Sequence, residues 1–107
     1  MVKELKSTDE FVQEITNQKG YALIDFWAVW CQPCRMMAPV VEKVAEELSD
    51  LRVYKVNVDE VSSLSEGFEI MSIPTLIIFK DGNPIHRLSG YRPFDVLLHD
   101  IKEVIEQ

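Results

Sequence analysis

The sequence contains little of the chemistry that metal sites and disulfide scaffolds require, with two cysteines and two histidines in 107 residues. Two cysteines are too few for a fold held together by disulfides. The histidines, His86 and His99, are separated by 13 positions, which misses the short spacing of the histidine ligands in common zinc modules. We therefore expect no metal site.

Long hydrophobic runs and an excess of positive charge are also absent. The N-terminal segment MVKELKSTDEF has no continuous apolar stretch after its lysines, and later apolar runs are too short to span a membrane. Asp and Glu outnumber Lys and Arg by 18 to 11, which gives a net charge of −7. Phosphate binding needs a basic surface, so nucleic acids and anionic membranes are poor candidates as partners. These features favour a cytoplasmic protein, with a monomer as the default state.

Neither repeats nor linkers divide the chain, and its length fits one domain, residues 1–107. The hydrophobic periodicity alternates between that of strands and that of helices. It predicts strands over residues 2–5, 21–28, 52–59, 74–80 and 84–90. It predicts helices over 7–15, 61–68 and 94–105, and a long helix that begins at the cysteines and carries its apolar positions from residue 37 to residue 48. Strands joined by helices favour parallel pairing, and the Asp81-Gly82 turn favours one antiparallel hairpin. The predicted class is α/β, with helices on both faces of a mixed, twisted sheet.

Both cysteines lie in the stretch WAVWCQPCRM, at the predicted junction between a buried strand and the longest helix. A helix N-terminus presents free N–H groups and a partial positive charge, which stabilise a thiolate. Cys31 and Cys34 are three positions apart, so they lie on one side of the first helical turn and can form an internal disulfide. We expect Cys31 to be exposed and to attack, and Cys34 to be shielded and to resolve the mixed disulfide. Pro33 suits this first turn, where its missing N–H costs little.

Three other interpretations of the cysteine pair stay open at this stage. The pair could be half of a zinc site, or two unrelated buried cysteines. Cysteine-protease chemistry would need a positioned histidine, and the sequence ties neither histidine to the pair. A CxxC motif beside a βαβ pattern favours redox chemistry over all three.

One acidic residue, Asp25, interrupts the apolar stretch LIDFW. Burying a carboxylate is costly, so a specific role is expected for it. A raised pKa would suit a base that takes the proton of Cys34. The alternative is a structural ion pair with Lys55, the one charge in VYKVNV, and both roles can hold at once.

Two segments resemble the thioredoxin family. DFWAVWCQPCRMMAP is similar to the family's active-site segment and SIPTLIIFKDG to its second signature, and the resemblance covers essentially the whole chain. It implies a thioredoxin-like fold, with about five strands flanked by four helices. It further implies a reversible Cys31–Cys34 disulfide with Cys31 as nucleophile, no other cofactor, protein disulfides as substrates, and a thioredoxin reductase-type electron donor. Asp25 matches the family's buried carboxylate, and Lys55 matches the partner of that carboxylate.

The resemblance also implies a substrate-binding surface beside the cysteines. Pro74 matches the family's cis-proline, which would leave the backbone of Ile73 free to pair with an extended substrate segment. The residues assigned to this surface are Trp30, Gln32, Pro33, Ile73, Pro74 and Gly90. Gln32 stands where the family usually has glycine, and in this superfamily the residues between the cysteines tune redox poise. Preference among reductase partners and substrates is therefore where this chain is expected to differ.

A general protein-disulfide reductase is the favoured function. An oxidase or isomerase on the same fold would need a more oxidising cysteine pair. A non-enzymatic module would use the surface around Pro74 only to hold a partner. The retained Pro33 and the expected cytoplasmic location favour the reductase.

Overall fold

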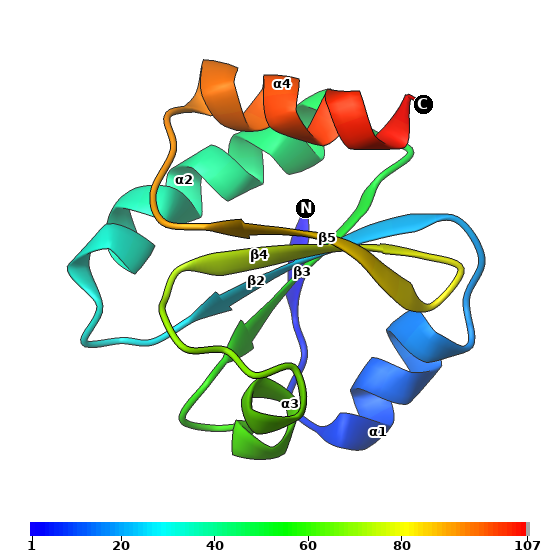
Figure 1. Ribbon diagram of the computed structural model, residues 1–107, viewed down its shortest axis with the longest axis vertical. Coiled ribbons are helices and arrows are strands. Elements are labelled where there is room, and N and C mark those ends of the chain that lie inside the picture. Colours follow the sequence, from blue (N-terminus) through cyan, green and yellow to red (C-terminus); the bar gives the residue numbers. More distant parts are fainter. Residues whose placement is uncertain (107) are drawn as a thin grey trace.

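The computed structural model describes residues 1–106, and its elements follow the expected order (Figure 1). The strands are β1 (Val2–Glu4), β2 (Tyr21–Trp27), β3 (Arg52–Asn57), β4 (Thr75–Lys80) and β5 (Asn83–Ser89). The helices are α1 (Thr8–Phe11), which continues directly into the π-helical segment η1 (Val12–Thr16), α2 (Gln32–Glu47), α3 (Ser62–Gly67) and α4 (Phe94–Ile105). The predicted α/β class, with a five-stranded mixed sheet and four α-helices, is confirmed.

The strands form one sheet in the order β1-β3-β2-β4-β5. β3 pairs in parallel with both β1 and β2, whereas β4 runs antiparallel to β2 and to β5. The prediction that strands joined by helices would pair in parallel is therefore wrong for β4, which follows α3. The connection through α3 returns the chain to the same end of the sheet at which β3 finishes, so β4 runs in the opposite direction to β3. As a result, β4 begins at the edge where β2 and β3 end.

The predicted hairpin joins β4 and β5 through Asp81 and Gly82. Both residues have positive φ, 51° and 85°, as a tight hairpin turn of this type requires. A Cβ atom at Gly82 would lie 2.5 Å from the carbonyl oxygen of Thr16, so glycine is needed for space as well as for conformation.

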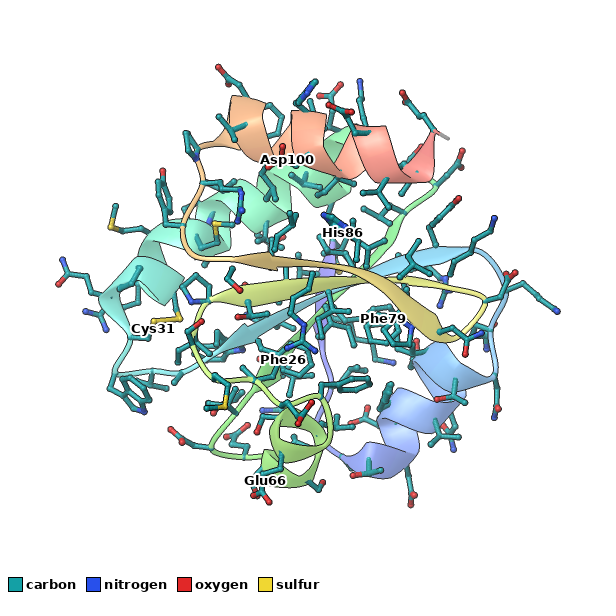
Figure 2. The ribbon with its side chains drawn as sticks, viewed as in Figure 1. Phe26, Cys31, Glu66, Phe79, His86 and Asp100 are labelled. Carbon is teal, nitrogen blue, oxygen red and sulfur yellow. A yellow bond between two sulfur atoms is a disulfide. The ribbon has the colours of Figure 1, made fainter. Side chains whose placement is uncertain are left out.

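Two helical layers cover the sheet: α2 and α4 lie on one face, and α1 and α3 on the other (Figure 1). β2 lies at the centre, and its alternate side chains enter both cores. Leu23 packs with Met37 of α2, whereas Ile24 and Phe26 join Phe79 on the α1 side (Figure 2). Burial on both faces explains the nearly continuous apolar run of this strand.

The apolar stripe of α2 holds the helix against the sheet. Its buried residues recur at helical spacing and include Met37, Val41, Val44 and Ala45. Shortening a fully buried side chain such as Met37 to alanine costs about 2–5 kcal/mol in comparable cores. This packing fixes the N-terminus of α2 at the end of β2. No helix within residues 1–106 is long and apolar enough to cross a bilayer.

Candidate active site

Cys31 and Cys34 form a disulfide at the junction between β2 and α2, visible beside the Cys31 label in Figure 2. Cys31 is the N-cap of α2, and its Sγ accepts a hydrogen bond from the backbone N–H of Cys34 at 3.2 Å. Pro33 lies in the first turn, as expected. The Cα atoms of the two cysteines are 5.2 Å apart. The predicted placement at a strand-to-helix junction is confirmed, and the disulfide favours redox chemistry over a zinc half-site.

The two cysteines are shielded almost equally, with 5% of Cys31 and 3% of Cys34 exposed. The expectation that Cys31 is exposed is therefore wrong for the disulfide form. Val58 and Ile73 pack against the pair, and the carbonyl oxygen of Ile73 lies 3.7 Å from the Sγ of Cys31. These neighbours are distant in the sequence, which is why the local pattern around the cysteines does not predict the shielding.

A groove of about 720 Å³ opens on the Cys31 side of the disulfide. Its walls come from residues 30–33, from Val58 after β3, from one side of α3 and from residues 70–73. It therefore lies where β2 and β3 end and β4 begins. Four residues of the predicted binding surface line it, namely Trp30, Gln32, Pro33 and Ile73.

Trp30 is the largest apolar side chain that lines the groove, and 69% of it is exposed. Its indole N–H donates a hydrogen bond to the Asp59 carboxylate at 2.9 Å. The backbone N–H of Asp59 donates in turn to the side-chain oxygen of Asn57 at 2.8 Å. An exposed aromatic ring is thus held in one orientation. Asp59 does not stand out in the sequence, because an acidic residue just after a strand is ordinary on a protein surface.

Pro74 and Gly90 support the groove from behind. The Ile73–Pro74 peptide bond is cis, as the resemblance implies. The carbonyl oxygen of Pro74 accepts a hydrogen bond from the N–H of Gly90 at 2.8 Å, and Gly90 has a φ of 89°. Within residues 1–106 the groove lining includes neither of these two residues. Of the predicted surface, they are the part that does not contact the open space.

Asp25 lies behind the disulfide, where it shares a small cavity of about 100 Å³ with Cys34. Only 3% of Asp25 is exposed, and within the described chain its Oδ1 has no hydrogen-bond partner. Burial raises the pKa of this carboxyl from 3.8 to about 7. The nearby Lys55 opposes this rise in pKa, and Glu4 adds to it. The predicted raised pKa therefore has a clear structural cause.

Lys55 lies directly across from Asp25 in the β2–β3 register, but its ammonium group pairs elsewhere. Its Nζ lies 3.9 Å from a carboxylate oxygen of Glu4 and 5.5 Å from the centre of the Trp27 ring. Among the ion pairs of residues 1–106 there is none between Lys55 and Asp25. The structural ion pair weighed from the sequence is thus not formed. Glu4, which does not stand out in the sequence, forms the ion pair with Lys55 instead.

Comparison with known proteins decides the family. The family model for thioredoxin matches residues 2–103. The chain belongs to the thioredoxin family. It is 47% identical over 100 residues to thioredoxin from Alicyclobacillus acidocaldarius, covering 92% of this chain and 95% of that one. It is 43% identical over 93 residues to thioredoxin-2 from Saccharomyces cerevisiae, covering 87% and 89%.

Solved thioredoxin structures share the fold. The crystal structure of Malassezia sympodialis thioredoxin (Mala s 13) superposes with a TM-score of 0.87 at 36% identity, covering 95% of this chain and 91% of that one. Family membership and the Cys31–Cys34 disulfide identify the protein as a thiol–disulfide oxidoreductase and a protein-disulfide reductase. The oxidase, isomerase and non-enzymatic alternatives are not favoured. Within residues 1–106, no three His, Cys, Asp or Glu side chains gather as metal ligands.

Proposed function

We propose that Cys31 is the residue that attacks protein disulfides, because it faces the large open groove whereas Cys34 faces the much smaller cavity. The Cys31 thiolate attacks one sulfur of a substrate disulfide, and the other substrate sulfur leaves as a thiolate. A mixed disulfide between Cys31 and the substrate results. Cys34 then loses its proton and attacks the Sγ of Cys31. The Cys31–Cys34 disulfide forms, the second substrate thiol is released, and the substrate has gained two electrons.

Asp25 is the base that takes the proton of Cys34 in this scheme. It is adjacent to Cys34 in the same cavity, and its pKa of about 7 makes it a stronger base than an ordinary carboxylate near neutral pH. Lys55 stabilises the ionised carboxylate from the neighbouring strand. The proton therefore moves on the side of the disulfide away from the substrate.

The groove binds an extended segment of the substrate. Trp30, Gln32 and Pro33 form one wall, and the backbone at Ile73 pairs with the segment as an added strand would. Pro74 and Gly90 hold Ile73 in place through their backbone hydrogen bond. A substrate disulfide lying along Ile73 is brought over the Sγ of Cys31.

The remaining features of the proposal rest on the family and on composition. The protein works as a single domain of 107 residues and as a monomer, with its disulfide as the only redox group. A thioredoxin reductase-type enzyme restores the dithiol. The net charge of −7 argues against nucleic acid and anionic membranes as partners. The substrates in this proposal are disulfide-containing proteins of the cytoplasm, as the family suggests.

Catalysed reduction of insulin under dithiothreitol tests the role of Cys31. We expect a rate well above background for the natural protein and none for Cys31→Ser. Redox titration against glutathione tests the direction of the chemistry, and we expect a potential in the reducing range of thioredoxins, near −270 mV, rather than about −180 mV as in isomerases. Full activity of Cys31→Ser would refute the assignment of the nucleophile.

A further inference from the structure

Glu4, Lys55 and Asp25 form a row across three neighbouring strands. Lys55 on β3 is the direct register partner of Glu4 on β1 and of Asp25 on β2. In parallel pairing, residues directly opposite each other point to the same face of the sheet. All three side chains therefore lie on the face covered by α2, with the lysine in the middle and an acid on either side.

The lysine is held by the outer acid. Its Nζ lies 3.9 Å from Glu4 Oε1, and the Trp27 ring lies beside it. The other carboxylate oxygen of Glu4 accepts a hydrogen bond from the backbone N–H of Asn57 at 3.2 Å. Glu4 is therefore fixed by the sheet, and only 18% of its side chain is exposed. Asp25, on the inner side of the row, keeps an oxygen without any partner among the described residues.

We propose that Glu4 is a positioning residue for disulfide reduction: it holds the Lys55 ammonium away from Asp25, so that Asp25 stays an unpaired base behind Cys34. The inference rests on the proposed role of Asp25 in proton transfer. Glu4 is not part of the cavity lining beside Cys34, and its positioning effect passes through Lys55, in addition to the direct repulsion between the two carboxylates. This arrangement assigns a role to a residue of the edge strand that lies outside both signature segments.

The charged and titratable groups that face Asp25 come from three elements. β3 contributes Lys55 and β1 contributes Glu4, while α2 contributes Cys34, Arg35 and Glu42 to the cavity wall; β4 places the apolar Leu76 opposite. Arg35 is engaged with the carbonyl oxygen of Val29 at 2.7 Å. Lys55 is therefore the cation of this set that can move toward Asp25 when Glu4 is neutralised.

The substitution Glu4→Gln tests the proposal, because the amide oxygen can still accept the Asn57 N–H while the charge is lost. Lys55 is then free to approach Asp25, and the repulsion from Glu4 also disappears, so both changes lower the pKa of Asp25. We expect a fall of about one pH unit, measured by carbon-13 NMR of the Asp25 carboxyl in the oxidised protein, in which no cysteine titrates. The control is Glu46→Gln, an exposed residue of α2 that removes the same charge and should leave the titration unchanged. An unchanged titration in Glu4→Gln overturns the proposal.

A second experiment, in the Lys55→Met background, distinguishes the positioning of Lys55 by Glu4 from direct charge repulsion between Glu4 and Asp25. In Lys55→Met, the substitution Glu4→Gln should shift the Asp25 titration by less than half as much as it does in the natural protein. Equal shifts in the two backgrounds would show that Glu4 acts only as a distant charge, and the proposal would fall. The proposed proton-transfer role is tested separately, because Asp25→Asn should slow release of the mixed disulfide. If it does not, that role fails, while the titration still reports whether Glu4 positions Lys55.

Discussion

Cys31 and Cys34 are three residues apart and almost equally buried, yet they face very different surroundings. The Cys31 side is an open groove of about 720 Å³. The Cys34 side is a cavity of about 100 Å³ that contains a buried carboxyl, with room for a few water molecules and not for a polypeptide. The exposed fraction of the cysteines therefore does not separate the proposed attacking residue, Cys31, from the proposed resolving residue, Cys34. The space and charge beside each sulfur make that distinction.

The largest expected effect tests directly whether the two cysteines have different roles. Cys34→Ser should abolish turnover, as Cys31→Ser does, but only Cys34→Ser should accumulate a covalent adduct with a disulfide-containing protein. The reason is that Cys31 can still attack through the groove, whereas nothing remains on the cavity side to resolve the adduct. Mass spectrometry after mixing with an oxidised substrate measures the adduct. Adducts on Cys34 in Cys31→Ser, at a comparable rate, would contradict the assignment.

The second-largest effect is on the free energy of unfolding, and it tests the buried carboxyl in the cavity beside Cys34. Because the folded-state pKa of Asp25 is about 7 and its ordinary value is 3.8, the folded protein binds more protons than the unfolded chain between these values. Stability from this group is therefore greatest below about pH 4 and is lost as the pH rises to about 7. Asp25→Asn should stabilise the oxidised protein by about 4 kcal/mol at pH 8.5 and by almost nothing at pH 4. Urea unfolding at the two pH values measures this difference. An equal gain in stability at both pH values would argue against a buried carboxyl with a raised pKa.

A smaller effect is expected on the groove side. Trp30→Ala should lower kcat/KM for a protein disulfide about tenfold, since tryptophan contributes strongly at binding surfaces. Asp59→Asn should lower it two- to threefold at most, because it weakens only the hydrogen bond that orients the indole. Met36→Ala is the matched control, as Met36 is an exposed apolar residue outside the groove lining. Equal losses for Met36→Ala and Trp30→Ala would show that the groove is not the binding surface.

The smallest effect is expected for Gln32→Gly. Gln32 is exposed at the groove, and among the hydrogen bonds of residues 1–106 none joins its side chain to either cysteine. We therefore expect the reduction potential to change by less than about 30 mV, which corresponds to a tenfold change in the equilibrium constant. Relative kcat/KM values for different protein substrates should change more than the potential does. A larger shift in potential would show that Gln32 acts on the cysteines themselves.

Much of the fold could be predicted from the sequence, because its signals are local. The continuous apolar run of β2, the helical spacing of Met37, Val41 and Val44, and the Asp81-Gly82 turn each specify one element. The direction of β4 could not be predicted. It depends on the path of the chain through α3, and hydrophobic periodicity carries no information on that path.

The candidate site divides in the same way. The cysteine pair is recognised by its close spacing, and Asp25 by its charge within an apolar stretch. Both signals come from residues that are neighbours in the sequence. The shielding of Cys31 depends on Val58 and Ile73, and the capture of Lys55 depends on Glu4, more than 50 positions away. Such contacts come from strand register and loop packing, so they needed the structure.

The origin of the groove walls has a consequence for engineering. The lining side chains belong to connecting segments, the first turn of α2 and the short helix α3, whereas the Asp25 cavity depends on the register of the three neighbouring strands β1, β3 and β2. Loops tolerate substitution far better than paired strands do. A library that varies residues 70–72 and the exposed Gln32 at the start of α2 is therefore expected to select new protein substrates while the cavity proposed for proton transfer stays intact. Under the proposed function, substrate recognition thus depends on segments that tolerate change, and the chemistry depends on strands that tolerate little.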